Sequence, residues 1–318
     1  MTLLTVSNLT KSFPGPNKTR VRAVCDVSFT VDEGEILGVV GESGCGKTTL
    51  GQAILSLVEP DSGTVIFDGL NLGSATKAEL KRSRRDIQVI FQDPFGSLNP
   101  RHKIGYVIAE PLIVHGVRSR DERSARVAEL LDLVGLPADA ADRFPHEFSG
   151  GQRQRIAIAR ALALNPRLIV ADESVSALDV SIQSQILNLI ADLRIKLGMS
   201  IIFISHDLSV IRHISDRIAV MYMGRIVELG PAQEIMRDPK HPYTRALLAS
   251  VPRIGESRER PSAVIFGEPP DPANPPPGCA FSNRCPDVMP ACRTGRPDLL
   301  LIAGETDGVK TACHLYTS

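Results

Sequence analysis

A glycine-rich segment of eight residues carries the clearest potential for chemistry. It reads Gly41-Glu42-Ser43-Gly44-Cys45-Gly46-Lys47-Thr48, and the spacing G-x4-G-K-T is typical of loops that hold nucleotide phosphates. Glycines let the backbone turn its N–H groups toward phosphate oxygens at the start of a helix. Lys47 adds a full positive charge, and Thr48 offers a hydroxyl to Mg²⁺. We expect a nucleoside triphosphate with Mg²⁺ to be bound by Gly41, Ser43, Gly44, Cys45, Gly46, Lys47, Thr48 and Thr49.

A second candidate site follows an apolar run. Leu168–Ala171 is typical of a buried strand, and Asp172 and Glu173 come directly after it. Asp172 is suited to hold the Mg²⁺ shell, and Glu173 to polarise an attacking water as general base. An ordinary strand end with two solvated acids would look the same. A position on one parallel sheet with the phosphate loop favours the catalytic interpretation.

A third motif combines a serine with two glycines. Ser149, Gly150, Gly151 and Gln152 come just before the predicted helix Gln154–Leu164. Such a helix start offers free N–H groups at the positive end of the helix dipole, which suits a second anion site. A single nucleotide can contact both this motif and the phosphate loop only if two chains pack head to tail.

These motifs need a scaffold that alternates strands and helices. Apolar runs and alternating patterns predict strands, and periodic patterns predict helices. The predicted strands are Leu3–Leu9, Val24–Val31, Glu35–Val40, Leu168–Ala171 and Ser200–Ser205. The predicted helices are Lys47–Val58, Gln154–Leu164 and Ser181–Leu197, with further helix between about 100 and 144. This order predicts an α/β fold with a mostly parallel sheet.

Taken together, residues from about 3 to 250 closely resemble the ATPases of ABC transporters, because the motifs occur in that family's order. The resemblance implies a P-loop cassette over residues 1–250, with a RecA-like parallel sheet core and an antiparallel β subdomain. It also implies a helical signature subdomain over about 100–160. Each ATP would then lie between Lys47 of one subunit and Ser149 of the other.

The resemblance implies roles for four more residues. Gln92 resembles the Q-loop glutamine that contacts Mg²⁺ and the membrane partner, and Asp179 ends a segment that resembles the D-loop. His206 resembles the switch histidine that senses the γ-phosphate. Phe13 resembles the aromatic that stacks on adenine, although a core or surface aromatic would also explain it. The implied catalytic residues are thus Glu173, His206 and Gln92, and the implied Mg²⁺ residues are Thr48, Gln92 and Asp172.

The chain after Val251 differs in composition. Residues 269–277 contain six prolines, so this stretch is expected to be a semi-rigid linker within an extension over 251–318. The segment from His241 to Leu248 resembles the oligopeptide and dipeptide importer ATPases and their nickel-uptake relatives. The residues around Gln92 resemble the second of the two paired ATPases of those systems. The resemblance implies a paralogous second ATPase, two transmembrane permeases and an extracytoplasmic solute-binding protein as partners.

Four cysteines lie close together in the extension: Cys279, Cys285, Cys292 and Cys313. Their C-x5-C-x6-C-x20-C spacing fits neither the short zinc motifs nor the ferredoxin run, so zinc, a [4Fe–4S] cluster and reduced thiols all stay open. His314 is an alternative ligand. The surrounding residues resemble the cluster-binding tail of peptide-importer ATPases, which implies [4Fe–4S].

Composition and charge give no support to a nucleic-acid partner. The 36 basic residues balance the 36 acidic ones, and only 4% of residues are aromatic, so no nucleic-acid partner is expected. No signal peptide or spanning apolar run is visible, so we expect a soluble, cytoplasmic chain that acts at a membrane only through a partner. The resemblance to importer ATPases implies a peripheral position on the cytoplasmic face of the membrane, with no transmembrane segment of its own. Two alternatives are a soluble ABC ATPase acting in DNA repair or on ribosomes, and an iron–sulfur sensor that ATP regulates.

Overall fold

The computed structural model describes residues 1–15, 19–93, 96–176, 178–250, 268, 270–302 and 308–316. The chain divides into two compact units, each treated by itself: unit 1 (1–3, 31–35 and 74–204) and unit 2 (4–30, 36–73 and 205–318). Pro94 and Ala177, which belong to the predicted Q-loop and D-loop segments, lie outside the described residues, as do 251–267 in the predicted extension.

Unit 2 contains a four-stranded sheet with the order β2-β1-β4-β5. Its strands are β1 (Thr2–Pro14), β2 (Arg20–Asp32), β4 (Ser62–Phe67) and β5 (Leu70–Asn71). β4 pairs antiparallel with both β1 and β5. The alternating pattern of β2 places Cys25, Val27, Phe29 and Val31 on one buried face, as a period of two residues requires.

A second group of strands in unit 2 leads to the phosphate loop. β3 (Ile36–Val40) runs parallel to β9 (Arg217–Tyr222), which pairs antiparallel with β10 (Arg225–Pro231). β12 (Lys310–Thr311) pairs antiparallel with β10 and with β11 (Leu300–Leu301). Every residue of β3 is buried, as expected for a strand in a parallel sheet core.

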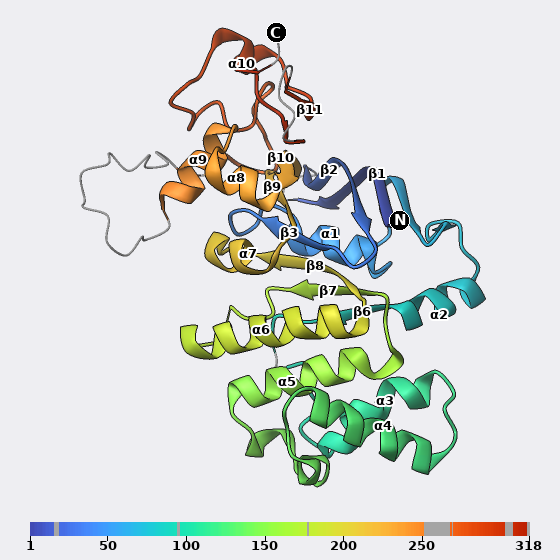
Figure 1. The fold of residues 1–318 in the computed structure, drawn as a ribbon. Helices are drawn as coiled ribbons and strands as arrows, with labels where there is room; N and C mark the ends of the chain where they lie inside the picture. Colours follow the sequence, from blue (N-terminus) through green and yellow to red (C-terminus); the bar gives the residue numbers. More distant parts are fainter. Residues whose placement is uncertain are drawn as a thin grey trace. The chain divides into compact units, whose positions relative to one another are not determined.

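Unit 2 also contains helices. They are α1 (Lys47–Ile54), α7 (Leu208–Ile214), α8 (Ala232–Arg237), α9 (Pro242–Ala249) and α10 (Pro290–Thr294). α7 packs on β3, and α8 packs on β9 and β10. In Figure 1 the red and orange extension with α10 and β11 lies beside α8, α9 and β10.

Unit 1 combines a parallel sheet with a helical layer. The strands β6 (Ile87–Ile90), β7 (Leu168–Asp172) and β8 (Ser200–Ser205) are all parallel, with β7 in the middle. The helices are α2 (Lys77–Asp86), α3 (Ile104–Val114), α4 (Arg120–Leu133), α5 (Gly150–Ala161) and α6 (Val180–Leu197), and the 3₁₀ turns are η2 (Ala138–Asp142), η3 (Pro145–Glu147) and η4 (Leu162–Leu164). α3 packs against α4 and α5, as Figure 1 shows in green.

The predicted α/β architecture with a separate antiparallel sheet is confirmed. The predicted limits of the cassette at residue 250 and of the helical subdomain stay predictions. None of the described helices is long and apolar enough to cross a membrane.

Candidate functional site

The phosphate loop connects β3 to α1, which begins at Lys47. Lys47 is buried, and its Nζ donates hydrogen bonds to the carbonyl oxygens of Gly41 at 2.8 Å and Glu42 at 3.0 Å. The ammonium group therefore lies inside the curve of the loop. There it can donate a charge-assisted hydrogen bond to a phosphate oxygen. Burial raises the pKa of the neighbouring Cys45 thiol, although the charge of Lys47 opposes this shift.

Two glycines let the loop lie directly against neighbouring backbone. Gly46 has a φ of 106°, and a Cβ atom there would lie 1.9 Å from the carbonyl oxygen of Ala23. A Cβ atom at Gly41 would lie 2.1 Å from the carbonyl oxygen of Met221. No side chain fits at either position, so close packing requires glycine at both, and at Gly46 the positive φ requires it as well.

The loop is also held by the C-terminal part of the chain. Arg284 binds the Glu42 carboxylate with both ends of its guanidinium, Nη1 to Oε2 at 2.8 Å and Nη2 to Oε1 at 3.0 Å. The side chain of Arg284 is only 6% exposed and that of Glu42 25%. The backbone N–H of Glu42 donates to the Tyr243 hydroxyl at 2.9 Å. One residue of the phosphate loop is thus held through both its side chain and its backbone.

The pKa values of Arg284 and Tyr243 are shifted in directions that preserve these contacts. Burial alone would lower the pKa of Arg284, but its hydrogen bonds to Glu42 and Tyr222 outweigh that effect and raise it. Burial raises the pKa of the Tyr243 hydroxyl, which keeps the phenol neutral. The Arg284 guanidinium that binds the Glu42 carboxylate therefore stays charged at physiological pH.

A buried carboxyl fixes the start of α9, which carries Tyr243. Glu228 is fully buried and accepts hydrogen bonds from the backbone N–H of Lys240 at 2.6 Å and of His241 at 3.1 Å. Burial raises the pKa of Glu228 to about 7. Burial also lowers the pKa of His241 to about 3, so its neutral Nδ1 accepts from the N–H of Tyr243 at 3.0 Å. These bonds position Tyr243 for its contact with the loop.

In unit 1, two of the predicted catalytic residues are in contact. The Nε2 of Gln92 donates to Oε2 of Glu173 at 2.9 Å. Glu173 follows directly on β7, which ends at Asp172, and its N–H donates to the carbonyl of Ile204 on β8 at 3.0 Å. Its φ of 44° is unusual for a residue other than glycine. A strained backbone at a candidate general base supports a functional role for this residue.

The serine–glycine motif opens α5. Ser149 is the N-cap, and its N–H donates to Oε1 of Gln152 at 3.0 Å while its Oγ accepts from the N–H of Gln152 at 3.4 Å. A Cβ atom at Gly151 would lie 2.5 Å from Cγ2 of Ile182 on α6. Gly151 is therefore required for helix packing, a reason that its sequence position did not reveal. At Gly150 a Cβ atom would meet Leu178 at an ordinary contact distance of 3.5 Å.

The remaining predicted residues lie at element ends or on the surface. His206 is exposed and follows β8, and Asp179 is the N-cap of α6. Phe13 near the end of β1 is 37% exposed, with the Lys11 ammonium 5.5 Å from its ring centre. Unit 2 contains the phosphate loop, Phe13 and His206. Unit 1 contains Gln92, Asp172, Glu173, Asp179 and the Ser149 motif.

Comparisons with known proteins agree with this arrangement. Residues 24–176 match the family described as ABC transporter, and residues 227–292 match the C-terminal region of oligopeptide/dipeptide transporters. A probable peptide ABC transporter ATP-binding protein of Sinorhizobium fredii, y4tS, is 51% identical, with 98% of this chain and 90% of that protein covered. The oligopeptide transport ATP-binding protein AppF of Bacillus subtilis is also 51% identical, with 93% and 90% covered. The chain belongs to the ABC transporter ATPases.

Solved cassettes share the fold. The ATP-binding cassette MJ0796, determined as a dimer bound to ADP and phosphate, superposes with a TM-score of 0.65 at 32% identity, covering 72% of this chain and 99% of that one. For cbiO1 of Clostridium perfringens, part of an ABC transporter complex, the TM-score is 0.66 at 27% identity, with 74% and 91% covered. The predicted cassette fold and ATPase activity are thereby confirmed.

The two matched regions meet at the phosphate loop. Glu42 lies in the cassette region, whereas Tyr243 and Arg284 lie in the oligopeptide/dipeptide region. This C-terminal region therefore supplies direct contacts to the nucleotide-binding loop of this ATPase. Sequence reasoning missed both contacts, since Glu42 occupies a variable loop position and is 242 residues from Arg284.

The four cysteines gather without forming a ready metal site. All four are free thiols, and the charges of Cys279, Cys292 and Cys313 each raise the pKa of at least one other cysteine of the four. The N–H of Cys279 donates to the carbonyl of Cys292 at 2.8 Å. Burial raises the pKa of Cys285 to about 11. Across the described residues, however, no group of three or more Cys, His, Asp or Glu is arranged to hold a metal ion.

We expect Arg284→Met to weaken ATP binding by about tenfold. The loss of two charge-assisted hydrogen bonds leaves the Glu42 carboxylate uncompensated beside the phosphates, and such bonds contribute about 1.5–3 kcal/mol. The measurement is ATP affinity by titration of a fluorescent nucleotide. The exposed Arg293→Met in the same extension is the control. If both variants bound ATP equally well, the contact between Arg284 and Glu42 would not determine the ATP-binding conformation of the phosphate loop.

Proposed function

We propose that this chain is the ATP-hydrolysing subunit of an importer for peptides. The observation that carries the proposal is the direct contact of the oligopeptide/dipeptide region with the phosphate loop through Arg284 and Tyr243. Relatives that cover almost the whole chain are named as peptide or oligopeptide transport proteins. A peptide cargo explains both observations.

The proposed mechanism assigns one step to each candidate residue. Lys47 and the N–H groups of the loop bind the β- and γ-phosphates. Thr48, Gln92 and Asp172 would hold Mg²⁺, which would neutralise part of the phosphate charge. Glu173 accepts a proton from the attacking water, whose oxygen bonds to the γ-phosphorus as the bond to the β-phosphate oxygen breaks. Gln92 positions Glu173 through their 2.9 Å hydrogen bond.

The same proposal places each ATP between two cassettes. Ser149, Gly150 and Gly151 of one subunit would contact the γ-phosphate bound at Lys47 of the other, and Gln152 would hold Ser149 in place. His206 would sense that phosphate, Asp179 would contact the partner cassette, and Phe13 would stack on adenine. The dimer of the related cassette with ADP and phosphate supports this arrangement. ATP would then hold the cassettes together until hydrolysis releases them.

The partners follow from this role. We infer a second ATPase subunit, a paralogue of this chain, together with two transmembrane permeases and an extracytoplasmic solute-binding protein. The complex would place this chain on the cytoplasmic face of the membrane, with no nucleic acid involved. The cassette would occupy residues 1–250, with its helical subdomain at about 100–160, and the extension 251–318.

For the cysteines we propose a [4Fe–4S] cluster held by Cys279, Cys285, Cys292 and Cys313. Their gathering in one small region and the absence of any disulfide among them support the donor set. The thiols would have to move closer together than they are in the described arrangement. No step of ATP hydrolysis passes through this group.

Replacing Glu173 with Gln should abolish turnover but not ATP binding. A general base contributes about 10²–10⁴-fold to rate, so phosphate release by the purified chain should fall by at least about a hundredfold. The exposed Glu59→Gln is the matched control. A Glu173→Gln variant that releases phosphate at the wild-type rate would remove this residue from the mechanism.

The transport role is tested by purifying the tagged chain from detergent-solubilised native membranes and identifying the proteins that accompany it. We expect two permeases and a second ATPase. Recovery with ribosomes or DNA-repair proteins from the soluble fraction would overturn the transport role and leave the ATPase activity standing.

The cluster is tested by counting iron and acid-labile sulfide after anaerobic purification. We expect about four of each per chain, a loss of both in Cys285→Ser, and no loss in Cys25→Ser. About one zinc per chain without sulfide would favour the zinc alternative, and a metal-free, folded protein would contradict any resident metal.

A further inference from the structure

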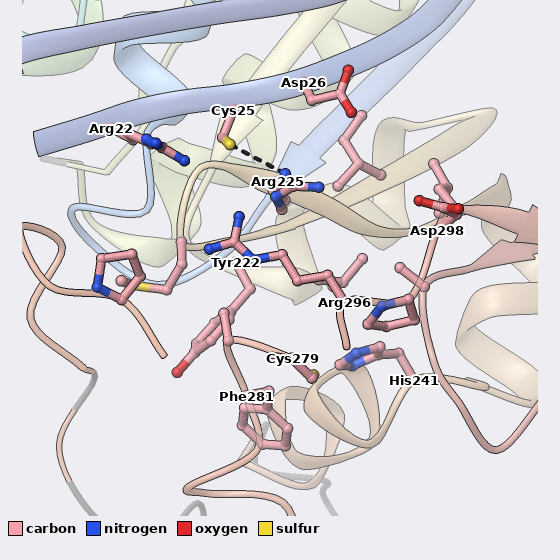
Figure 2. A pocket seen from close by; sticks show the side chains of 18 of the residues that line it. Arg22, Cys25, Asp26, Tyr222, Arg225, His241, Cys279, Phe281, Arg296 and Asp298 are labelled. Atoms are coloured by element: carbon pink, nitrogen blue, oxygen red, sulfur yellow. Dashed lines mark hydrogen bonds between the residues drawn. The ribbon is translucent and has the colours of Figure 1, made fainter. Parts of the chain in front are cut away.

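Unit 2 contains a cavity of about 290 Å³ that the ATPase mechanism does not use. It lies among β2, the β9–β10 hairpin and the extension, and no residue of the phosphate loop lines it. Its volume is at the lower end for small-molecule sites. Figure 2 shows the side chains that surround it.

One wall of the cavity is apolar and rigid. Tyr222, Ile226 and Phe281 are buried, and the Tyr222 and Phe281 rings meet edge to face with their centres 5.4 Å apart. Pro275 adds a stiff segment of backbone. This wall suits the hydrocarbon body of a ligand.

Three arginines also line the cavity. Arg22, Arg225 and Arg296 come from β2, β10 and the extension, and in Figure 2 the ends of Arg225 and Arg296 point into the same part of the cavity. Arg225 donates to the Cys25 sulfur at 3.3 Å. Within the described ranges, none of the three has a carboxylate partner. Asp26, which also lines the cavity, accepts from the Asn8 amide at 2.8 Å.

This arrangement has an electrostatic consequence. Arg22, Arg225, Arg296 and Lys310 outnumber the two acids of the lining, Asp26 and Asp298. Like charges in a concave, partly apolar site repel one another and raise the local concentration of anions. The guanidinium fork matches the two oxygens of a carboxylate or phosphate.

We propose that this cavity binds a small organic anion, a carboxylate or phosphate monoester on an apolar body, and that binding alters the phosphate loop. The link is Tyr222, whose ring lines the cavity and whose hydroxyl accepts from Nη1 of Arg284 at 3.2 Å. The same nitrogen donates to the Glu42 carboxylate. An occupant that moves the Tyr222 ring therefore acts on the residue that holds the loop. The proposal depends on the ATPase but not on the identity of the cargo.

Binding is tested by calorimetry of the full chain with three probes of one shape at constant ionic strength: 3-phenylpropionate, phenyl phosphate and the neutral 3-phenylpropionamide. We expect the anions to bind at least about tenfold more tightly than the amide, because a hydrogen bond to a charged group contributes about 1.5–3 kcal/mol. The tighter of the two anions identifies the acid group. Equal binding of all three probes, or none at millimolar concentration, overturns the proposal.

Variants locate the site. Arg225→Met and Arg296→Met should each weaken anion binding by about tenfold or more, whereas the exposed Arg118→Met, outside the cavity, should not. Anion binding that survives both cavity variants would place the anion elsewhere and overturn the assignment.

The link is tested by measuring ATP affinity with and without the anion. Coupled sites typically change each other's affinity by about fivefold or more, and reciprocally. Tyr222→Phe keeps the ring but removes the hydroxyl, so it should leave anion affinity within about twofold and abolish the effect on ATP. An unchanged ATP affinity in the wild type would overturn the coupling, and so would coupling that persists in Tyr222→Phe.

Discussion

The site depends on a close backbone contact between the phosphate loop, β2 and the turn that joins β9 to β10. The N–H of Gly224 in that turn donates to the carbonyl of Cys45, and the N–H of Cys25 donates to the carbonyl of Gly224, both at 2.8 Å. Gly46 lies against Ala23, where no side chain fits. The loop therefore has the antiparallel sheet on one side and the β9–β10 hairpin on another. A change in either one must alter the positions of the N–H groups that receive phosphate.

The candidate motifs were predictable from sequence because each consists of residues that are adjacent in the chain. The phosphate loop is contiguous, and the strand Leu168–Ala171 with its two acids needs only an apolar run and a strand end. Helix α6 shows the limit of periodicity. Leu197 follows the buried Leu193 by four residues, one helical turn, yet it is 37% exposed, while Leu187 is buried. Tertiary packing, rather than the helical period, decides such positions.

The contacts between distant segments could not be predicted. No sequence pattern links Glu42 to Arg284. The short strand β12 has no hydrophobic alternation that would predict its antiparallel pairing with β10. The unusual φ of Glu173 is likewise invisible in a sequence. The hydrogen bond from Gln92 to Glu173 was not part of the role predicted for Gln92, and only the structure shows it. The candidate reacting groups were thus predictable from sequence, whereas the residues that hold them became visible only in the fold.

The extension has few apolar residues of its own, so its order must come from other interactions. Phe281 is its buried anchor and packs on Tyr222 and Tyr243. Three residues earlier, Gly278 lies so close to the carbonyl of Cys292 that a Cβ atom would be 2.2 Å away. Any interaction that fixes the cysteine loops therefore also fixes Phe281 and, through it, the direction of Arg284. Because Arg284 binds Glu42, the geometry of the phosphate loop depends on the stability of the extension. Disordering the cysteine region should therefore weaken nucleotide binding, although the cysteines act on the loop only through Phe281 and Arg284.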